Sequence, residues 1–148
     1  MTATITITNP ILSGMNPDPS WFWDDEFQRI VLVTSTFELV PGLPIYVSED
    51  MTCWKHVSNV VDADLARRLL IPFVDDSGGV YAPTLRRIHG KYVIACTIAR
   101  LDDRRAMEGG CTESELMRFH AAEGNFILEA DSIEGPWHGP FWIEGAEG

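Results

Sequence analysis

The sequence predicts a mainly β protein made of about two four-stranded antiparallel units, arranged as neighbouring blades of a β-propeller. Three observations predict this class. Short runs rich in Val, Ile, Thr and aromatic residues alternate with Gly, Pro and acidic turn signals along the 148 residues. Sustained helical periodicity occurs in one place only. The order of the runs in the first half recurs in the second half, as expected for repeated blades.

Four strand-like runs make up the first unit. Aromatic or β-branched residues dominate them, as is typical of strands. Acidic residues at 24–26 and 49–50 and prolines at 41 and 44 supply the turns. The first two runs are therefore expected to form a hairpin. The runs are Ser20 to Asp24, Gln28 to Phe37, Ile45 to Ser48, and one that begins at Trp54.

The second unit repeats this order. Pro83 and Thr84 open it as Pro19 and Ser20 open the first unit. Trp137 begins its last strand, as Trp54 does in the first unit. An eight-stranded sandwich is the competing architecture, because strand periodicity alone does not separate the two. The expected strands are Ala82 to Ile88, Lys91 to Ile98, Asn125 to Ala130, and one from Trp137.

The second unit is longer because of an insertion between its second and third strands. Thr112 and Glu115 have the spacing of a capping box, and apolar residues follow, so a short surface helix is expected there. We therefore assign one partial domain at 1–148, with a first blade at about 9–61, a second blade at about 78–145 and the insertion at about 100–124.

Charge and hydropathy exclude two classes of partner. Eleven Lys and Arg against 22 Asp and Glu give a net charge of -11, which opposes binding to nucleic acid and to anionic membrane surfaces. No apolar run approaches the roughly 18 to 20 residues of a spanning helix. The N-terminal residues lack the basic and apolar regions of a secretory signal, so we expect a cytoplasmic protein.

Neither the cysteines nor the histidines have metal-site spacing. Cys53, Cys96 and Cys111 are odd in number and far apart, which indicates packed or reduced thiols. None of the four histidines forms an H-x-x-x-H or H-E-x-x-H pattern. We expect no metal and no cofactor.

The densest group of special residues lies between Asn9 and Ser20. Asp18 has a proline on each side, Pro17 and Pro19. A residue before proline is pushed toward extended geometry, so a stiff backbone is expected to aim this carboxylate. Rigid placement suits a catalytic base, although a turn-initiating Asp has the same local pattern.

The chain resembles glycoside hydrolase family 43, in particular its β-xylosidase and α-L-arabinofuranosidase members. The resemblance runs from Asn9 to about Gly145 and rests on motifs that occur in the same order and at the same spacing. The matching segments are Asn9 to Ser20, Thr34 to Glu38, Pro41 to Tyr46, Ser48 to Asp50 with Trp54, Gly78 to Thr84, Lys91-Tyr92, Asn125-Phe126, and Gly135 to Trp137.

The resemblance implies a five-bladed propeller that hydrolyses O-glycosidic bonds in xylan-derived sugars, either β-xylosides or α-L-arabinofuranosides, with inversion. It assigns the general base to Asp18. It places Phe37 in the aromatic wall around the bound sugar. Tyr81 stands where the family usually carries Trp, which keeps an aromatic ring in this substrate-binding position but with a smaller area.

The resemblance also implies two further carboxylates that have no match here. The family's pKa-modulating Asp follows the Gly-Pro-Trp strand, and its general-acid Glu lies further downstream. Glu144 and Glu147 match no family motif and are expected to be solvated. Asp24, Asp25 and residues 62–64 are expected to be turn and loop charges. We therefore expect weak or no hydrolysis by this chain alone.

Two other functions remain open. A related five-bladed fructosidase also carries an N-terminal Asp, but its motif places Asn directly before that Asp, whereas Pro17 intervenes here. A non-catalytic sugar-binding module would keep Asp18, Phe37 and Tyr81 as a shallow cleft. For the family 43 glycosidase and for the sugar-binding module, the expected partner is a xylo-oligosaccharide or an arabinoside. Unpaired blade edges would also permit self-association.

Overall fold

The computed structural model describes residues 4–145, which form two four-stranded antiparallel sheets with their strands in chain order. The prediction of a mainly β chain with two such units is confirmed. The first sheet contains β1 (Ser20–Asp24), β2 (Arg29–Val33), β3 (Gly42–Ser48) and β4 (Lys55–Val61). The second contains β5 (Val74–Ile88), β6 (Lys91–Leu101), β7 (Asn125–Ala130) and β8 (His138–Trp142).

The first sheet separates its side chains by the two-residue period of a strand. On β1, Phe22 is half-buried and Asp24 is fully buried, while Trp21 and Trp23 are exposed. The ring of Phe22 lies 6.4 Å from that of Tyr92 on β6, so this face of β1 is turned toward the second sheet. The opposite face carries the two exposed tryptophans.

A helical connector joins the two sheets. It contains α1 (Ala63–Arg68) and the 3-10 helix η1 (Ile71–Phe73). The carboxylate of Asp62 accepts a hydrogen bond of 2.8 Å from the amide of Leu65 and so caps α1. The expectation that 62–64 carry only loop charges is therefore wrong for Asp62, and also for Asp64, which lies within α1. Helices this short lie below the length at which apolar periodicity is visible in a sequence.

The second sheet begins earlier than expected. β5 starts at Val74 rather than Ala82, and its pairing with β6 shifts between Val74 and Gly79 and again between Tyr81 and Thr84. These bulges let the strand continue through a glycine pair that otherwise indicates a break. β6 likewise continues to Leu101.

The insertion in the second sheet forms two helices rather than one. They are α2 (Asp103–Glu108) and α3 (Glu113–Ala121). The predicted capping box of α3 is confirmed, since the Thr112 amide donates to Glu115 at 2.7 Å and the Glu115 amide donates to the Thr112 hydroxyl at 3.2 Å. No helix within residues 4–145 is long and apolar enough to cross a membrane.

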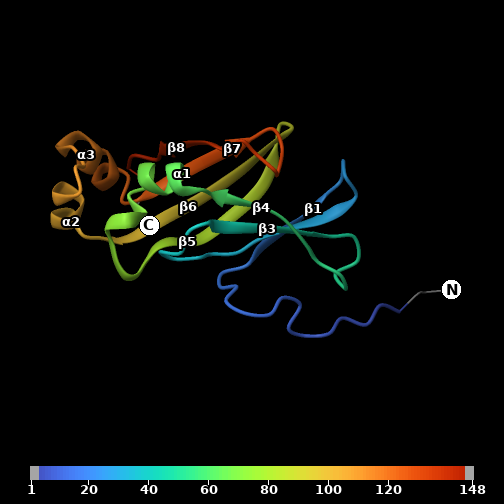
Figure 1. Ribbon diagram of the computed structural model, residues 1–148. Coiled ribbons are helices and arrows are strands. Elements are labelled where there is room, and N and C mark those ends of the chain that lie inside the picture. The colour runs from blue at the N-terminus through green and yellow to red at the C-terminus, as the bar shows by residue number, and fades with distance from the viewer. Residues whose placement is uncertain (1–3, 146–148) are drawn as a thin grey trace.

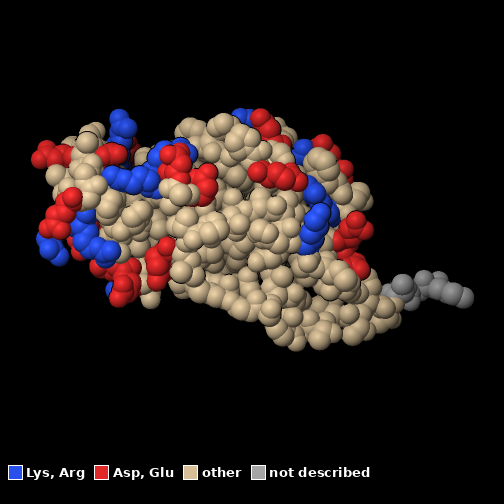
Figure 2. Space-filling view, in the orientation of Figure 1, with Lys and Arg blue, Asp and Glu red and all other residues tan. Residues whose placement is uncertain are grey.

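Buried apolar side chains join the two sheets and the connector into one core cluster. The helices lie at one end of the molecule, and the N-terminal segment extends at the other (Figure 1). On the face shown in Figure 2, charged side chains gather over the helical end and over the opposite end of the sheets, whereas the N-terminal segment carries none. The inner strands β1 and β5 are neighbours, and the candidate site lies where the start of β1 meets the middle of β5.

Candidate active site

Asp18 lies two residues before β1 and is exposed. Its φ angle is 50°, in the left-handed region, so the predicted extended backbone at this residue is wrong. Asp is among the residue types that tolerate this region best. The conformation is supported from outside the motif, because the carbonyl of Pro17 accepts a hydrogen bond of 2.9 Å from the amide of Ser35.

Ser35 also contacts the Asp18 side chain directly. Its hydroxyl donates to Oδ2 of Asp18 at 2.7 Å. The same hydroxyl oxygen accepts a hydrogen bond of 3.2 Å from the amide of Ala82 in β5. Ser35 is fully buried. The sequence placed Ser35 in a matching segment but gave no signal of this role.

Phe37 and Tyr81 form the second part of the site. Their ring centroids are 5.0 Å apart with an interplanar angle of 54°. The backbones of Phe37 and Val80 exchange hydrogen bonds of 2.9 and 3.3 Å, which joins the loop after β2 to β5. A Cβ on Gly79, whose φ is 100°, would overlap the carbonyl oxygen of Phe37, so this approach requires glycine.

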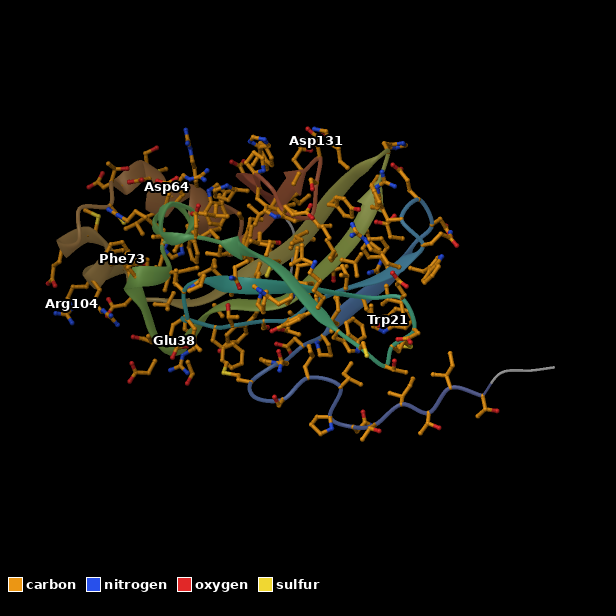
Figure 3. The ribbon with its side chains drawn as sticks, turned by 45° about the vertical axis from the view of Figure 1, so that its right-hand side comes forward. Trp21, Glu38, Asp64, Phe73, Arg104 and Asp131 are labelled. Atoms are coloured by element: carbon orange, nitrogen blue, oxygen red, sulfur yellow. The ribbon has the colours of Figure 1, made fainter. Side chains whose placement is uncertain are left out.

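A cleft of about 430 Å³ lies beside Asp18, between the start of β1 and the middle of β5. Trp21, which lines the cleft, lies on the side of the molecule away from Asp64 and Arg104 (Figure 3). Among residues 4–145, Asp18 is the one carboxylate that lines this cleft. Phe37 and Tyr81 do not line this cleft. Ser35, two residues before Phe37, contacts both the Asp18 carboxylate and the amide of Ala82, the residue after Tyr81. The lining residues are Asp18, Pro19, Ser20, Trp21, Ala82, Pro83, Thr84 and Arg86.

A buried thiol lies behind the site. The Sγ atom of Cys96 donates to the carbonyl of Tyr81 at 2.9 Å. Burial raises the pKa of Cys96 to about 12, and the negative charge of Asp18 contributes in the same direction. The thiol therefore stays protonated and acts as a small apolar group with a weak donor.

A charged cluster at the other end of β1 from Asp18 differs from expectation. Asp24 is not a solvated turn charge: it is buried, accepts a hydrogen bond from the hydroxyl of Tyr92 and lies 3.5 Å from Nη1 of Arg87. Burial, followed by the hydrogen bond to Asp24, raises the pKa of Tyr92. The hydrogen bond to Glu26 is the main cause that raises the pKa of Arg87. This cluster joins the two sheets.

The remaining candidate groups are apart from the site. Glu144 is exposed, and Glu147 lies outside the described residues. His120 pairs with Asp103 at 2.9 Å on the helical insertion. Cys53 is exposed, whereas Cys111 is buried. Residues 4–145 contain no group of three or more His, Cys, Asp or Glu side chains arranged to hold a metal ion.

Two antiparallel meander sheets that meet along their inner strands are the architecture of neighbouring propeller blades. With a carboxylate and an aromatic pair at that junction, the chain has the features of a carbohydrate-active propeller protein. A family model for glycosyl hydrolases family 43 matches residues 7–148, and the chain belongs to this family.

Similar proteins extend this assignment. A non-reducing end α-L-arabinofuranosidase of Bacteroides ovatus is 36% identical over 93% of this chain and 22% of its own length. A xylan 1,3-β-xylosidase of a Vibrio species is 34% identical over 93% of this chain and 22% of its own length. The chain thus spans about a fifth of the length of these relatives.

A solved structure shows the same fold. The xylan β-1,4-xylosidase of Bacillus halodurans superposes with a TM-score of 0.68 and 29% identity, covering 93% of this chain and 23% of that chain. Such structural relatives are five-bladed β-propeller enzymes. The two sheets described above therefore have the fold of propeller blades rather than of a sandwich.

Proposed function

We propose that this chain carries the general base of an inverting glycoside hydrolase that acts on β-xylosides or α-L-arabinofuranosides. Asp18 is the proposed base. The observation that carries the proposal is its placement: the carboxylate lies in an open cleft and is held by a buried serine hydroxyl. The activities named for the family 43 relatives support the substrate class.

The proposed chemistry is a single displacement. The Asp18 carboxylate removes a proton from a water molecule, and the water oxygen attacks the anomeric carbon from the face opposite the leaving group. A second carboxyl group protonates the leaving oxygen, at about 6.5–9.5 Å from the base in inverting enzymes. We propose that this acid and the carboxylate that modulates its pKa are supplied by residues outside this chain.

The aromatic pair is proposed to form the wall of the sugar pocket. Pentose rings present C–H groups that pack on aromatic faces. The rings of Phe37 and Tyr81 lie against each other, and the Tyr81 hydroxyl donates to the carbonyl of Ser77. This hydrogen bond restrains the Tyr81 ring from within its own strand.

The base can be tested in this chain without its acid. Dinitrophenyl glycosides have a leaving group that departs without protonation, so their hydrolysis requires only the base. We expect slow release of dinitrophenol from a β-xyloside or α-L-arabinofuranoside, with the inverted anomer formed first in proton NMR. The corresponding para-nitrophenyl glycosides, which have a poorer leaving group, should be hydrolysed weakly or not at all.

The matched variants are Asp18→Asn and Asp25→Asn, which change two exposed carboxylates on either side of β1. Asp18→Asn should reduce dinitrophenyl glycoside hydrolysis by about 10²-fold or more, the usual contribution of a general base. Asp25→Asn should leave the rate unchanged. Equal rates in both variants, or the retained anomer as first product, would contradict the proposal.

A second candidate is a sugar-binding module without catalysis. It is favoured by the presence of a single carboxylate among the described residues that line the cleft. Calorimetric titration with xylobiose and with arabinobiose distinguishes the two functions. Saturable binding that weakens in Phe37→Ala, together with no turnover of the dinitrophenyl glycosides, would favour the module.

A further inference from the structure

We propose that Ser35 is a positioning residue that orients the carboxylate of Asp18 and connects it to the backbone of the second sheet at Ala82. This inference rests on the proposed role of Asp18 as the base. It assigns a separate function to a residue whose side chain does not line the cleft.

The direction of the hydrogen bonds follows from the chemistry of the hydroxyl. A serine hydroxyl has one hydrogen to donate and lone pairs that accept. The amide of Ala82 can only donate, so it occupies a lone pair of the Ser35 oxygen at 3.2 Å. The hydroxyl hydrogen is therefore left for Oδ2 of Asp18, at 2.7 Å. Because Ser35 is fully buried, its hydroxyl relies on these two protein partners rather than on bulk water.

The donor at Ala82 is available because of the bulge in β5. Pairing with β6 shifts between Tyr81 and Thr84, and Ala82 has a φ of 44°. A bulge leaves backbone groups of the extra residue outside the ladder. Here the Ala82 amide is directed at Ser35 instead of at β6. The irregularity of β5 thus provides a fixed point for the side chain that holds the base.

Ser35 restrains Asp18 from two sides. Its amide holds the carbonyl of Pro17, the residue before Asp18, at 2.9 Å, while its hydroxyl holds the carboxylate. Among residues 4–145, no side chain or amide donates to Oδ1 of Asp18, which leaves this oxygen for a water molecule in the cleft. One carboxylate oxygen is therefore fixed and the other is free to accept a proton.

The test uses NMR on the isotope-labelled chain and compares Ser35→Ala with Ser58→Ala. Ser58 is a suitable control because its hydroxyl also makes a part-buried hydrogen bond between the two halves of the chain, from β4 to the carbonyl of Ile133 in the turn after β7, at 2.5 Å. Three-bond couplings to the Asp18 carboxyl carbon report its χ1 rotamer. They should indicate one rotamer in the parent and in Ser58→Ala, and averaging in Ser35→Ala.

The Ala82 amide gives a second reading. Its hydrogen exchange should be roughly tenfold faster in Ser35→Ala, the effect of losing one ordinary hydrogen bond, and unchanged in Ser58→Ala. Ser35→Thr, which keeps the hydroxyl, should restore the single rotamer and the slow exchange. An unchanged Asp18 rotamer and Ala82 exchange in a folded Ser35→Ala chain would overturn the proposal.

If replacement of the buried Ser35 prevents folding, a substitution at the exposed Asp18 tests the same connection. Asp18→Asn removes charge at an exposed residue, and its effect should reach the Ala82 amide shift through the Ser35 hydroxyl. The same substitution should not move the amide of Ser58. No shift change at Ala82 would also overturn the proposal. Because none of these readings requires turnover, they separate a failure of this inference from an absence of hydrolysis.

Discussion

The hydroxyl of Tyr92 in the second sheet donates a hydrogen bond of 2.5 Å to the buried carboxylate of Asp24 in the first sheet. Arg87 approaches the other oxygen of the same carboxylate at 3.5 Å. The last residue of β1 is thus held by two side chains from β5 and β6. This contact lies at the opposite end of β1 from Asp18 and completes the attachment of that strand to the second sheet.

We expect Asp24→Ala to lower the free energy of unfolding by about 3 kcal/mol, because it removes the acceptor of the Tyr92 hydroxyl and one of the two carboxylates that face Arg87. Tyr92→Phe should cost about 1–3 kcal/mol, since the carboxylate then loses a donor. Urea unfolding followed by tryptophan fluorescence measures both. The exposed neighbour provides the control: Asp25→Ala should change stability by less than about 0.5 kcal/mol. Equal effects at positions 24 and 25 would contradict the buried assignment.

Gly79→Ala should disrupt the junction between Phe37 and Val80. The added Cβ would meet the Phe37 carbonyl, in addition to the cost of a φ of 100°. Gly90→Ala is the matched control, because its φ is 83° and its Cβ would meet no atom within 4 Å. We expect a loss of about 1 kcal/mol at Gly90 and at least twice that at Gly79. Thermal unfolding compares them, and equal losses would show that the close approach is absent.

Thiol reactivity should differ sharply among the three cysteines. Iodoacetamide reacts with thiolates, and it should modify the exposed Cys53 within minutes at pH 8. Cys96 should stay unmodified because it is buried and its pKa is raised to about 12. Mass spectrometry of the native chain should show one rapid adduct, which disappears in Cys53→Ser. Rapid modification of Cys96 in the folded chain would be the contrary result.

Stability should fall in alkaline solution. The pKa of Cys96 rises from 9.0 to about 12 on folding, and burial also raises the pKa of Tyr92. Groups with a raised folded-state pKa stabilise fully below the unfolded pKa, and this contribution is lost as the pH rises toward the folded value. The free energy of unfolding should therefore decline between pH 9 and about 12. Cys96→Ala should make the decline shallower, and an identical slope would contradict this origin.

Local signals were sufficient for much of the fold. The bounds of β1 and β7 agree with prediction because turn residues flank both strands. The capping box at Thr112 was equally readable, since both partners lie within one helical turn. The start of β5 was not, because a glycine pair ordinarily indicates a break, and only the pairing with β6 shows that the strand continues.

The site was less accessible to sequence reasoning because its contacts are long-range. Ser35 meets residues that are 17 and 47 positions away, and a single serine has no periodic signature. Asp24 is a second example. The residues next to it in the sequence indicate a turn, whereas its partners Arg87 and Tyr92 are 63 and 68 positions away. Proline neighbours were misleading at Asp18, where contacts with Ser35 outweigh the local preference.

The join between Phe37 and Val80 is made by peptide groups, so it does not depend on the side chains there as long as neither residue is proline, which has no amide hydrogen. The ring at Tyr81 follows directly after this join and can be exchanged for a larger or smaller one without separating the sheets. Over generations, the depth of the proposed sugar pocket can therefore drift by single substitutions at that position. Gly79 has no such freedom, and it is the residue that natural variation should leave untouched.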